Sequence, residues 1–162
     1  MKNGVLPGRS LNRQRIDDTD RRILGELTTD GRVSFAELGR RVSLSPPAVA
    51  ERVQRLERVG VITGYRAEVD PRCLGYAMTA LVRIRPSAGQ LPRIPELAAE
   101  IPEIGECHRI TGEDCFFFKV HLRSIDDLGA LLDRFLVYGE TSTSLINASP
   151  IPRRDPPFAV DE

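Results

Sequence analysis

The sequence lacks the features that mark membrane-spanning, secreted and disulfide-stabilised proteins. No apolar run approaches the roughly 20 residues that a membrane-spanning helix needs. The first residues are basic but carry no apolar stretch of the kind found in a signal peptide, so we expect a cytoplasmic protein. The three cysteines are odd in number and show no Cys-x-x-Cys spacing. This pattern favours reduced thiols over a disulfide framework.

Motifs of common catalytic and metal sites are also missing. There is no glycine-rich phosphate loop ending in Lys, no Gly-x-Ser-x-Gly and no His-Glu-x-x-His. Metal-ligating residue types occur at Cys107, His108, Cys115 and His121. Their spacings match no usual zinc pattern, and strand alternation sends Cys107 and His108 to opposite faces. We therefore expect no catalytic residues, no metal site and no cofactor.

A net charge is absent as well, because 23 basic residues balance 23 acidic ones. A neutral total argues against nucleic-acid binding only if the charge is evenly spread. Residues 1–66 carry 13 basic and 8 acidic residues, whereas residues 67–162 carry 10 and 15. The two halves therefore have net charges of +5 and −5. Such an asymmetry between halves indicates interaction with nucleic acid.

The first half contains a basic arm and three predicted helices. Residues 1–15 hold four basic residues and no acid, which predicts a flexible basic arm. A first helix is expected to begin among residues 16–19, where several side chains can cap it, and to end before Asp30. Ser34 and Glu37 predict a capping box for the second helix, with the Glu side chain bonding back to the cap.

The third predicted helix begins at Ser45, a capping residue followed by Pro46 at the first helical position. Its apolar positions are Val49, Val53, Leu56 and Val59, and Gly60 ends it. Residues 61–69 are predicted to be extended. Two helices joined by a short turn and followed by an extended segment are typical of a winged helix-turn-helix. Residues 31–66 carry seven basic and three acidic residues, which concentrates positive charge on this unit.

The second half has the pattern of a different fold. Apolar residues alternate along 78–85, 104–110 and 116–123, helical spacing occupies 91–101 and 125–136, and residues 141–149 supply a fourth strand. The order βαββαβ predicts a ferredoxin-like domain, so the chain is α+β. Both faces of the sheet carry apolar residues, and we expect the open face to mediate self-association. The predicted boundaries are 1–15 for the arm, 16–64 for the winged helix-turn-helix, 65–76 for an extended hinge, 77–150 for the ferredoxin-like domain, and 151–162 for a Pro-rich tail.

Several segments in this order make the sequence resemble the Lrp/AsnC (feast/famine) family of transcriptional regulators. The matching segments are 16–24, 30–32, 44–46, Val49, 52–53, 55–57, 60–65, 106–108, 111–112 and 114–120. The resemblance implies a winged helix that binds DNA and a ferredoxin-like domain that dimerises and often binds an amino acid. It also implies that dimers assemble further, frequently to octamers. Binding to DNA places such a protein on the nucleoid.

The third predicted helix is the expected DNA-contacting element. Its N-terminal half would enter the major groove, where base edges offer a donor and acceptor code. The candidate residues are Ser45, Pro47, Ala48, Glu51, Arg52 and Arg55. Arg55 is suited to guanine and Glu51 to cytosine, whereas the alternative for Arg52 and Arg58 is pairing with Glu51 or Glu57 on the same helix. Arg32, Arg40 and Arg41 are expected to meet phosphates, which position the protein without specifying sequence.

The resemblance also implies an effector site near residues 111–115. The candidate residues are Thr111, Gly112, Glu113, Asp114 and Cys115, with Thr141, Ser142 and Thr143 donating from a neighbouring subunit. Gly112 allows close backbone approach, and Glu113 and Asp114 can accept from the ammonium of an amino acid. Cys115 stands where some members carry a second acid, and the alternative is a surface turn with solvated acids. We therefore expect a sequence-specific regulator that responds to an amino acid; the alternative function is an architectural nucleoid protein without an effector.

Overall fold

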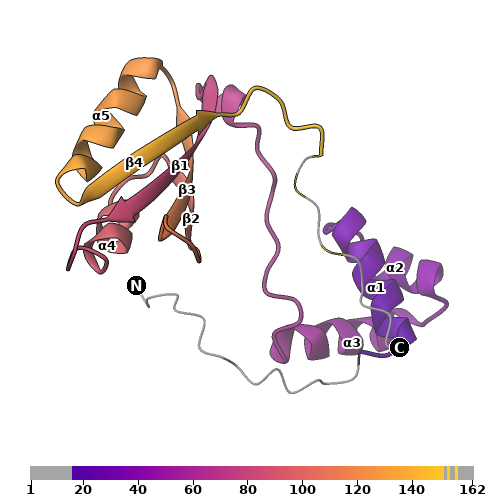
Figure 1. Ribbon diagram of the computed structural model, residues 1–162. Coiled ribbons are helices and arrows are strands. Elements are labelled where there is room, and N and C mark those ends of the chain that lie inside the picture. Colours follow the sequence, from indigo (N-terminus) through magenta and orange to yellow (C-terminus); the bar gives the residue numbers. More distant parts are fainter. Residues whose placement is uncertain (1–15, 152, 154–155, 157–162) are drawn as a thin grey trace. The chain divides into compact units, whose positions relative to one another are not determined.

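The computed structural model describes residues 16–151, 153 and 156 (Figure 1). The predicted basic arm, 1–15, and all of the predicted tail except residues 151, 153 and 156 lie outside the described residues. The described chain divides into two compact units, with the first boundary between Ala67 and Glu68. No helix in the described part is both long and apolar enough to cross a lipid bilayer.

The first unit contains three helices, α1 (Asp18–Thr29), α2 (Phe35–Val42) and α3 (Pro46–Arg58). Asp17 caps α1 by accepting from the Asp20 amide at 2.7 Å, and the Asp20 carboxylate accepts from the Asp17 amide at 3.1 Å. This reciprocal capping box satisfies two backbone donors that would otherwise lack partners at the start of the helix. The helix therefore begins where the sequence predicts.

The three helices bury one apolar cluster between them. Its members come from all three helices at helical spacing: Ile23, Leu24, Leu38, Val42, Val49, Val53 and Leu56. Each such side chain stabilises the fold by about 1.5–3 kcal/mol when it is fully removed from water. One face of α3 packs against α1 and α2 in this cluster. The opposite face of α3 makes no apolar contact with the cluster.

The predicted extended segment, 61–69, forms no hydrogen-bonded strand in the described part of the chain. The amides of Val61 and Ile62 donate to the Leu56 carbonyl, at 2.9 and 3.1 Å. They close the end of α3 and are therefore not available for a strand ladder. Between α3 and the first strand, the described chain holds one short 3-10 helix, Pro71–Leu74.

The second unit has the predicted βαββαβ order. Its elements are β1 (Met78–Pro86), α4 (Arg93–Ala99), β2 (Ile104–Arg109), β3 (Phe116–Leu122), α5 (Ile125–Leu136) and β4 (Gly139–Leu145). The sheet order is β2-β3-β1-β4 with every neighbouring pair antiparallel, which is the ferredoxin-like arrangement. Both α4 and α5 lie on one side of the sheet (Figure 1).

The fourth strand differs from its predicted range of 141–149. It begins at Gly139, which pairs with Pro86, and ends at Leu145, which pairs with Ala80. A Cβ at residue 139 would lie 2.2 Å from the Arg85 carbonyl oxygen, so only glycine fits this close approach. Beyond Leu145, the Ile146 amide still donates to the Thr79 carbonyl at 2.9 Å.

Alternation along the strands separates the two faces of the sheet. The buried face carries Val82, Phe118 and their neighbours, which pack with Phe135 of α5 and Ile94 of α4. On the open face, Leu81 pairs with Lys119, and Arg83 pairs with Phe117. The open face therefore mixes two apolar side chains with charged ones.

Candidate nucleic-acid interface

The turn between α2 and α3 is held by a close approach and two serine caps. Ser34 accepts from the Glu37 amide at 3.2 Å, and Ser45 accepts from the Ala48 amide at 3.4 Å. Ser43 ends α2 in the left-handed region with φ 60°. A Cβ at Gly39 would lie 2.6 Å from the Leu44 carbonyl oxygen, so a larger residue there would force the turn away from α2. These contacts fix the direction in which α3 leaves the turn.

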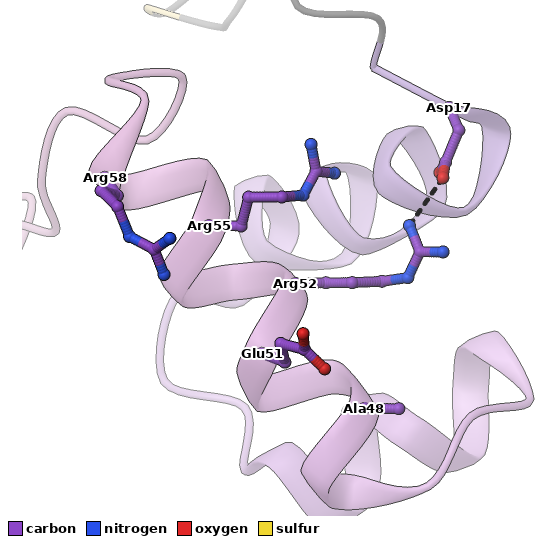
Figure 2. Close-up of a pocket in the computed structure, with 6 residues that line it drawn as sticks. All are labelled: Asp17, Ala48, Glu51, Arg52, Arg55 and Arg58. Carbon is purple, nitrogen blue, oxygen red and sulfur yellow. Dashed lines mark hydrogen bonds and ion pairs between the residues drawn. The ribbon is translucent and has the colours of Figure 1, made fainter.

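The solvent-facing side of α3 carries most of the predicted DNA-contacting residues. Ser45, Pro47 and Glu51 are exposed, and Ala48, Arg52 and Arg55 are half-buried. A concavity of about 400 Å³ lies along this side (Figure 2). It is lined by Asp17, Ala48, Glu51, Arg52, Arg55 and Arg58. The structure thus brings Ala48, Glu51, Arg52 and Arg55 together at one surface.

Two arginines of α3 are bound to the carboxylates of Asp20 in α1 and of Asp17, the residue before α1. Arg52 Nη1 donates to Asp17 Oδ2 at 2.7 Å and to Asp20 Oδ1 at 2.9 Å (Figure 2 draws the first of these). Arg55 Nη2 donates to Asp20 Oδ2. The hydrogen bond from Arg52 is the main cause that lowers the pKa of Asp17, and the bond to Asp17 is the main cause that raises the pKa of Arg52. The two helices are therefore linked by charge as well as by apolar packing.

The alternative of same-helix pairing for Arg52 is wrong, because its partners lie on α1 and in the residue before it. Glu57 instead accepts from the Tyr65 hydroxyl at 2.9 Å. Burial, helped by that bond, raises the pKa of Tyr65 to about 12. Arg58 is exposed and makes no ion pair with any described residue.

The predicted phosphate contacts on α2 are already engaged within the chain. Glu37 accepts from Arg40 Nη2 at 2.6 Å and from Arg41 Nε at 2.8 Å, and Arg41 Nη1 also reaches Glu26 at 2.8 Å. The hydrogen bonds from Arg40 and Arg41 lower the pKa of Glu37 to about 2. The predicted return bond from Glu37 to the cap is therefore not made, because both carboxylate oxygens bind guanidinium groups. The Arg32 side chain has no ion pair among the described residues, although its amide donates to Asp30 at 2.9 Å.

Residues 111–115 form the loop between β2 and β3. The Ile110 amide donates to the Cys115 carbonyl at 2.9 Å, and the Cys115 amide donates to the Ile84 carbonyl at 3.0 Å, which anchors the loop end to β1. Gly112 has φ 111°, a conformation that side chains other than glycine rarely adopt. Glu113 accepts from Arg85 at 2.5 Å, and its side chain is 86% exposed.

The three hydroxyl residues on β4 are divided between the two faces of the sheet. Thr141 and Thr143 pair with Ile84 and Val82, whose side chains are in the core, whereas Ser142 pairs with Arg83 on the open face. Thr143 Oγ1 is buried, and it has no hydrogen-bond partner among the described residues. Within one chain, no hydrogen bond joins these residues to the 111–115 loop in the described structure.

Sequence reasoning did not identify Asp17 and Asp20 as part of the α3 surface. Both lie in a run that was expected to cap α1, and capping is one of their roles. The described residues contain no cluster of three or more His, Cys, Asp or Glu side chains that could hold a metal ion. The sequence feature that could have identified Asp17 and Asp20 is the acidic charge of residues 16–30, which lie between two basic segments.

Comparison with family models gives two matches that together cover both units. Residues 16–57 match the AsnC-type helix-turn-helix domain. Residues 79–156 match the Lrp/AsnC ligand binding domain.

Two curated relatives match most of the chain. The HTH-type transcriptional regulator LrpC of Bacillus subtilis is 34% identical over 132 residues, or 82% of this chain and 92% of LrpC. The leucine-responsive regulatory protein of Salmonella typhimurium is 37% identical over 134 residues, or 81% of this chain and 79% of that protein.

Solved structures have the same fold. The structure of B. subtilis LrpC has a TM-score of 0.80 at 33% identity, and covers 85% of this chain and 98% of its own. A feast or famine regulatory protein from Mycobacterium tuberculosis, complexed with L-methionine, has a TM-score of 0.78 at 33% identity. That match covers 88% of this chain and 99% of the M. tuberculosis chain.

Proposed function

This chain belongs to the Lrp/AsnC family of transcriptional regulators, and from that premise we propose that it recognises DNA sequence through α3 and responds to an amino acid. The observation that carries the DNA part is the surface of α3. Three arginines and one glutamate there line a single concavity on the face opposite the apolar cluster (Figure 2). A helix with this arrangement suits the major groove of B-DNA.

The α3 side chains take different parts in recognition. Arg52 and Arg55 donate to guanine, and Glu51 accepts from the amino group of cytosine. Ser45, Pro47 and Ala48 bring the first turn of α3 against the groove. Arg32 contacts backbone phosphates. Arg40 and Arg41 contact phosphates too, with donors that are divided between Glu37 and the DNA.

The effector is an amino acid held near the 111–115 loop of the second unit. The relative solved with L-methionine supports this class of ligand. Glu113 and Asp114 supply acceptors for an ammonium group, and Thr111, Gly112 and Cys115 form the loop that carries them. Thr141, Ser142 and Thr143 come from a second copy of the chain, which is consistent with the lack of hydrogen bonds between them and the loop within one chain.

Self-association through the open sheet face completes this assembly, as a homodimer that can grow to an octamer. A ligand that prefers one assembly shifts the population toward it, and the spacing of α3 pairs on DNA shifts with it. The protein acts on the nucleoid in the cytoplasm.

The test of the DNA part is competition binding with the full chain. A duplex from the region upstream of its own gene competes with a random duplex of equal length at moderate salt. We expect a preference of at least about a thousandfold, the lower end for specific DNA-binding proteins. Equal affinity for the two duplexes contradicts sequence-specific recognition and favours the architectural alternative.

The test of the effector part is calorimetry against the twenty amino acids, with mass measured by light scattering in parallel. We expect one or a few amino acids to bind and to change the mass or the DNA affinity. Silence toward all twenty, together with retained DNA binding, contradicts the effector proposal.

A further inference from the structure

Asp20 is the one charged residue that is fully buried in the described part of the chain. It lies in the first turn of α1 and serves three partners. Oδ2 accepts from the Asp17 amide at 3.1 Å and from Arg55 Nη2, and Oδ1 accepts from Arg52 Nη1 at 2.9 Å. The bond from the Asp17 amide uses only Oδ2, and the side-chain oxygen of an asparagine at residue 20 can accept it. Oδ1 accepts from Arg52 alone and Arg55 shares Oδ2 with the cap, so the second oxygen and the negative charge serve the arginines.

The arginines keep donors that Asp20 does not occupy. A guanidinium group carries five N–H donors. The bonds of Arg52 to Asp17 and Asp20 use Nη1, so Nε and Nη2 have no described partner. Arg55 is bound through Nη2, which leaves Nε and Nη1. The two side chains are 32% and 37% exposed, so one side of each faces the buried carboxylate while the other reaches the concavity.

A buried ion pair is weak as a stabilising element, because desolvation offsets most of the attraction. Its effect on geometry is larger. A free arginine side chain loses rotamer entropy when it is fixed, and a side chain already held in place loses less on binding. A carboxylate that fixes two arginines of one DNA-contacting helix lowers the entropic cost of recognition at both.

We propose that Asp20 is a positioning residue for DNA recognition, holding the guanidinium groups of Arg52 and Arg55 so that their remaining donors face base edges. This inference rests on the proposed function of α3. It assigns to α1 a share in sequence discrimination, although Asp20 itself is buried and touches no DNA.

The test compares four variants of the full chain: Asp20→Asn, Asp18→Asn, Arg55→Ala and the Asp20→Asn/Arg55→Ala double variant. Each is measured for its ratio of affinities between the upstream duplex and a random duplex of equal length. Asp18→Asn is the matched control, since it removes the same charge from the same helix at a side chain that is fully exposed. Thermal unfolding of each variant ensures that binding is measured on folded protein.

We expect Asp20→Asn to lower the discrimination ratio about tenfold, within the range for one good base contact. Its affinity for the random duplex stays equal or rises, because a negative charge near the phosphates is lost. Asp18→Asn keeps the wild-type ratio. The effect of Asp20→Asn is smaller in the Arg55→Ala background, because the part that acts through Arg55 is already lost and only the part through Arg52 remains.

Two results overturn the inference. One is a wild-type ratio in Asp20→Asn, and the other is full additivity of Asp20→Asn and Arg55→Ala. If Asp20→Asn fails to fold, Asp17→Asn is the deciding variant, because it keeps a good cap and removes one charged partner of Arg52. We expect it to lower the discrimination ratio about threefold. A wild-type ratio in Asp17→Asn then overturns the inference. A wild-type chain without any preference contradicts the proposed function itself, whereas preference retained in Asp20→Asn contradicts only the positioning role.

Discussion

The α3 surface and the 111–115 loop are organised in opposite ways. Arg52 and Arg55 of α3 are bound to a buried carboxylate, so these two side chains are held within one chain before any ligand arrives. In the loop, Glu113 is exposed and tied only to Arg85, and Asp114 is half-buried. The β4 hydroxyl residues proposed to share its site make no hydrogen bond to it in the described structure.

This difference separates two routes to a functional site. A preordered surface gains affinity because little entropy is lost on binding. An open loop forms a complete ligand site only when groups from another copy of the chain are brought to it. Ligand binding at such a loop can therefore be coupled to assembly. In the proposed function, unit 1 supplies DNA recognition and unit 2 supplies the response to the amino acid, and each role has its own tests.

The largest expected effect is on the stability of the second unit and comes from removing a buried ring from the core of its sheet. Phe118→Ala deletes a fully buried ring that packs against Phe135, with ring centroids 5.3 Å apart. We expect a loss of about 3–5 kcal/mol in unfolding free energy, measured by urea denaturation. The two apolar clusters share no residue, so helical signal from α1–α3 should persist when the sheet unfolds.

Phe117→Ala is the control, since this half-buried ring lies on the open face of the same strand. Its cost should be clearly smaller. An equal loss in the two variants would mean that the open face is packed as tightly as the core.

The second effect distinguishes an arginine proposed to contact bases from one proposed to contact phosphates. Arg55→Ala should lower the preference for the upstream duplex by about tenfold to a hundredfold, as expected for loss of one bidentate base contact of about 1–3 kcal/mol. Arg40→Ala should weaken all duplexes alike and reduce the slope of affinity against salt by about one. Competition binding at several salt concentrations measures both, and identical effects of the two variants would contradict the assignment.

The third effect concerns the open loop. Asp114→Asn removes one proposed acceptor for the ligand ammonium, so the response to the amino acid found by calorimetry should be lost. DNA affinity without ligand should stay at the wild-type value, since Asp114 lies in the second unit. Asp133→Asn on α5 removes the same charge and should keep the response. A normal response in Asp114→Asn would place the ligand elsewhere.

The smallest effect is a pH dependence at α2. The pKa of Glu37 is lowered to about 2 by Arg40 and Arg41, from an ordinary value of 4.5. The ionised form is favoured by folding, so its contribution to stability is complete above about pH 5 and is lost as the pH falls toward 2. The unfolding temperature should therefore fall less steeply between pH 5 and pH 2 for Glu37→Gln than for the wild type.

Glu68→Gln is the matched control, because Glu68 makes no ion pair among the described residues. Its unfolding temperature should follow the wild-type curve. A Glu37→Gln curve parallel to the wild type would show that the arginine pair adds no stability in solution.

Much of the fold followed from local patterns. The serine caps of α2, α3 and α5, the proline at the start of α3 and the alternation of β1 and β3 all act between residues close in sequence. The extended pattern of residues 61–69 did not reveal that the amides of Val61 and Ile62 bind the Leu56 carbonyl at the end of α3. The expected capping box at Ser34 failed because Glu37 has better partners in Arg40 and Arg41.

The sequence by itself determined the helices, the strand order and the separation of charge, since periodicity and capping depend on neighbours along the chain. It also placed the arginines on the exposed side of α3. Only the tertiary structure decided what those arginines bind. Arg55 and Asp20 are 35 residues apart, and they meet because the apolar faces of α1 and α3 pack together and bury the carboxylate between the two helices. An ion pair depends on position in space, which no local pattern contains.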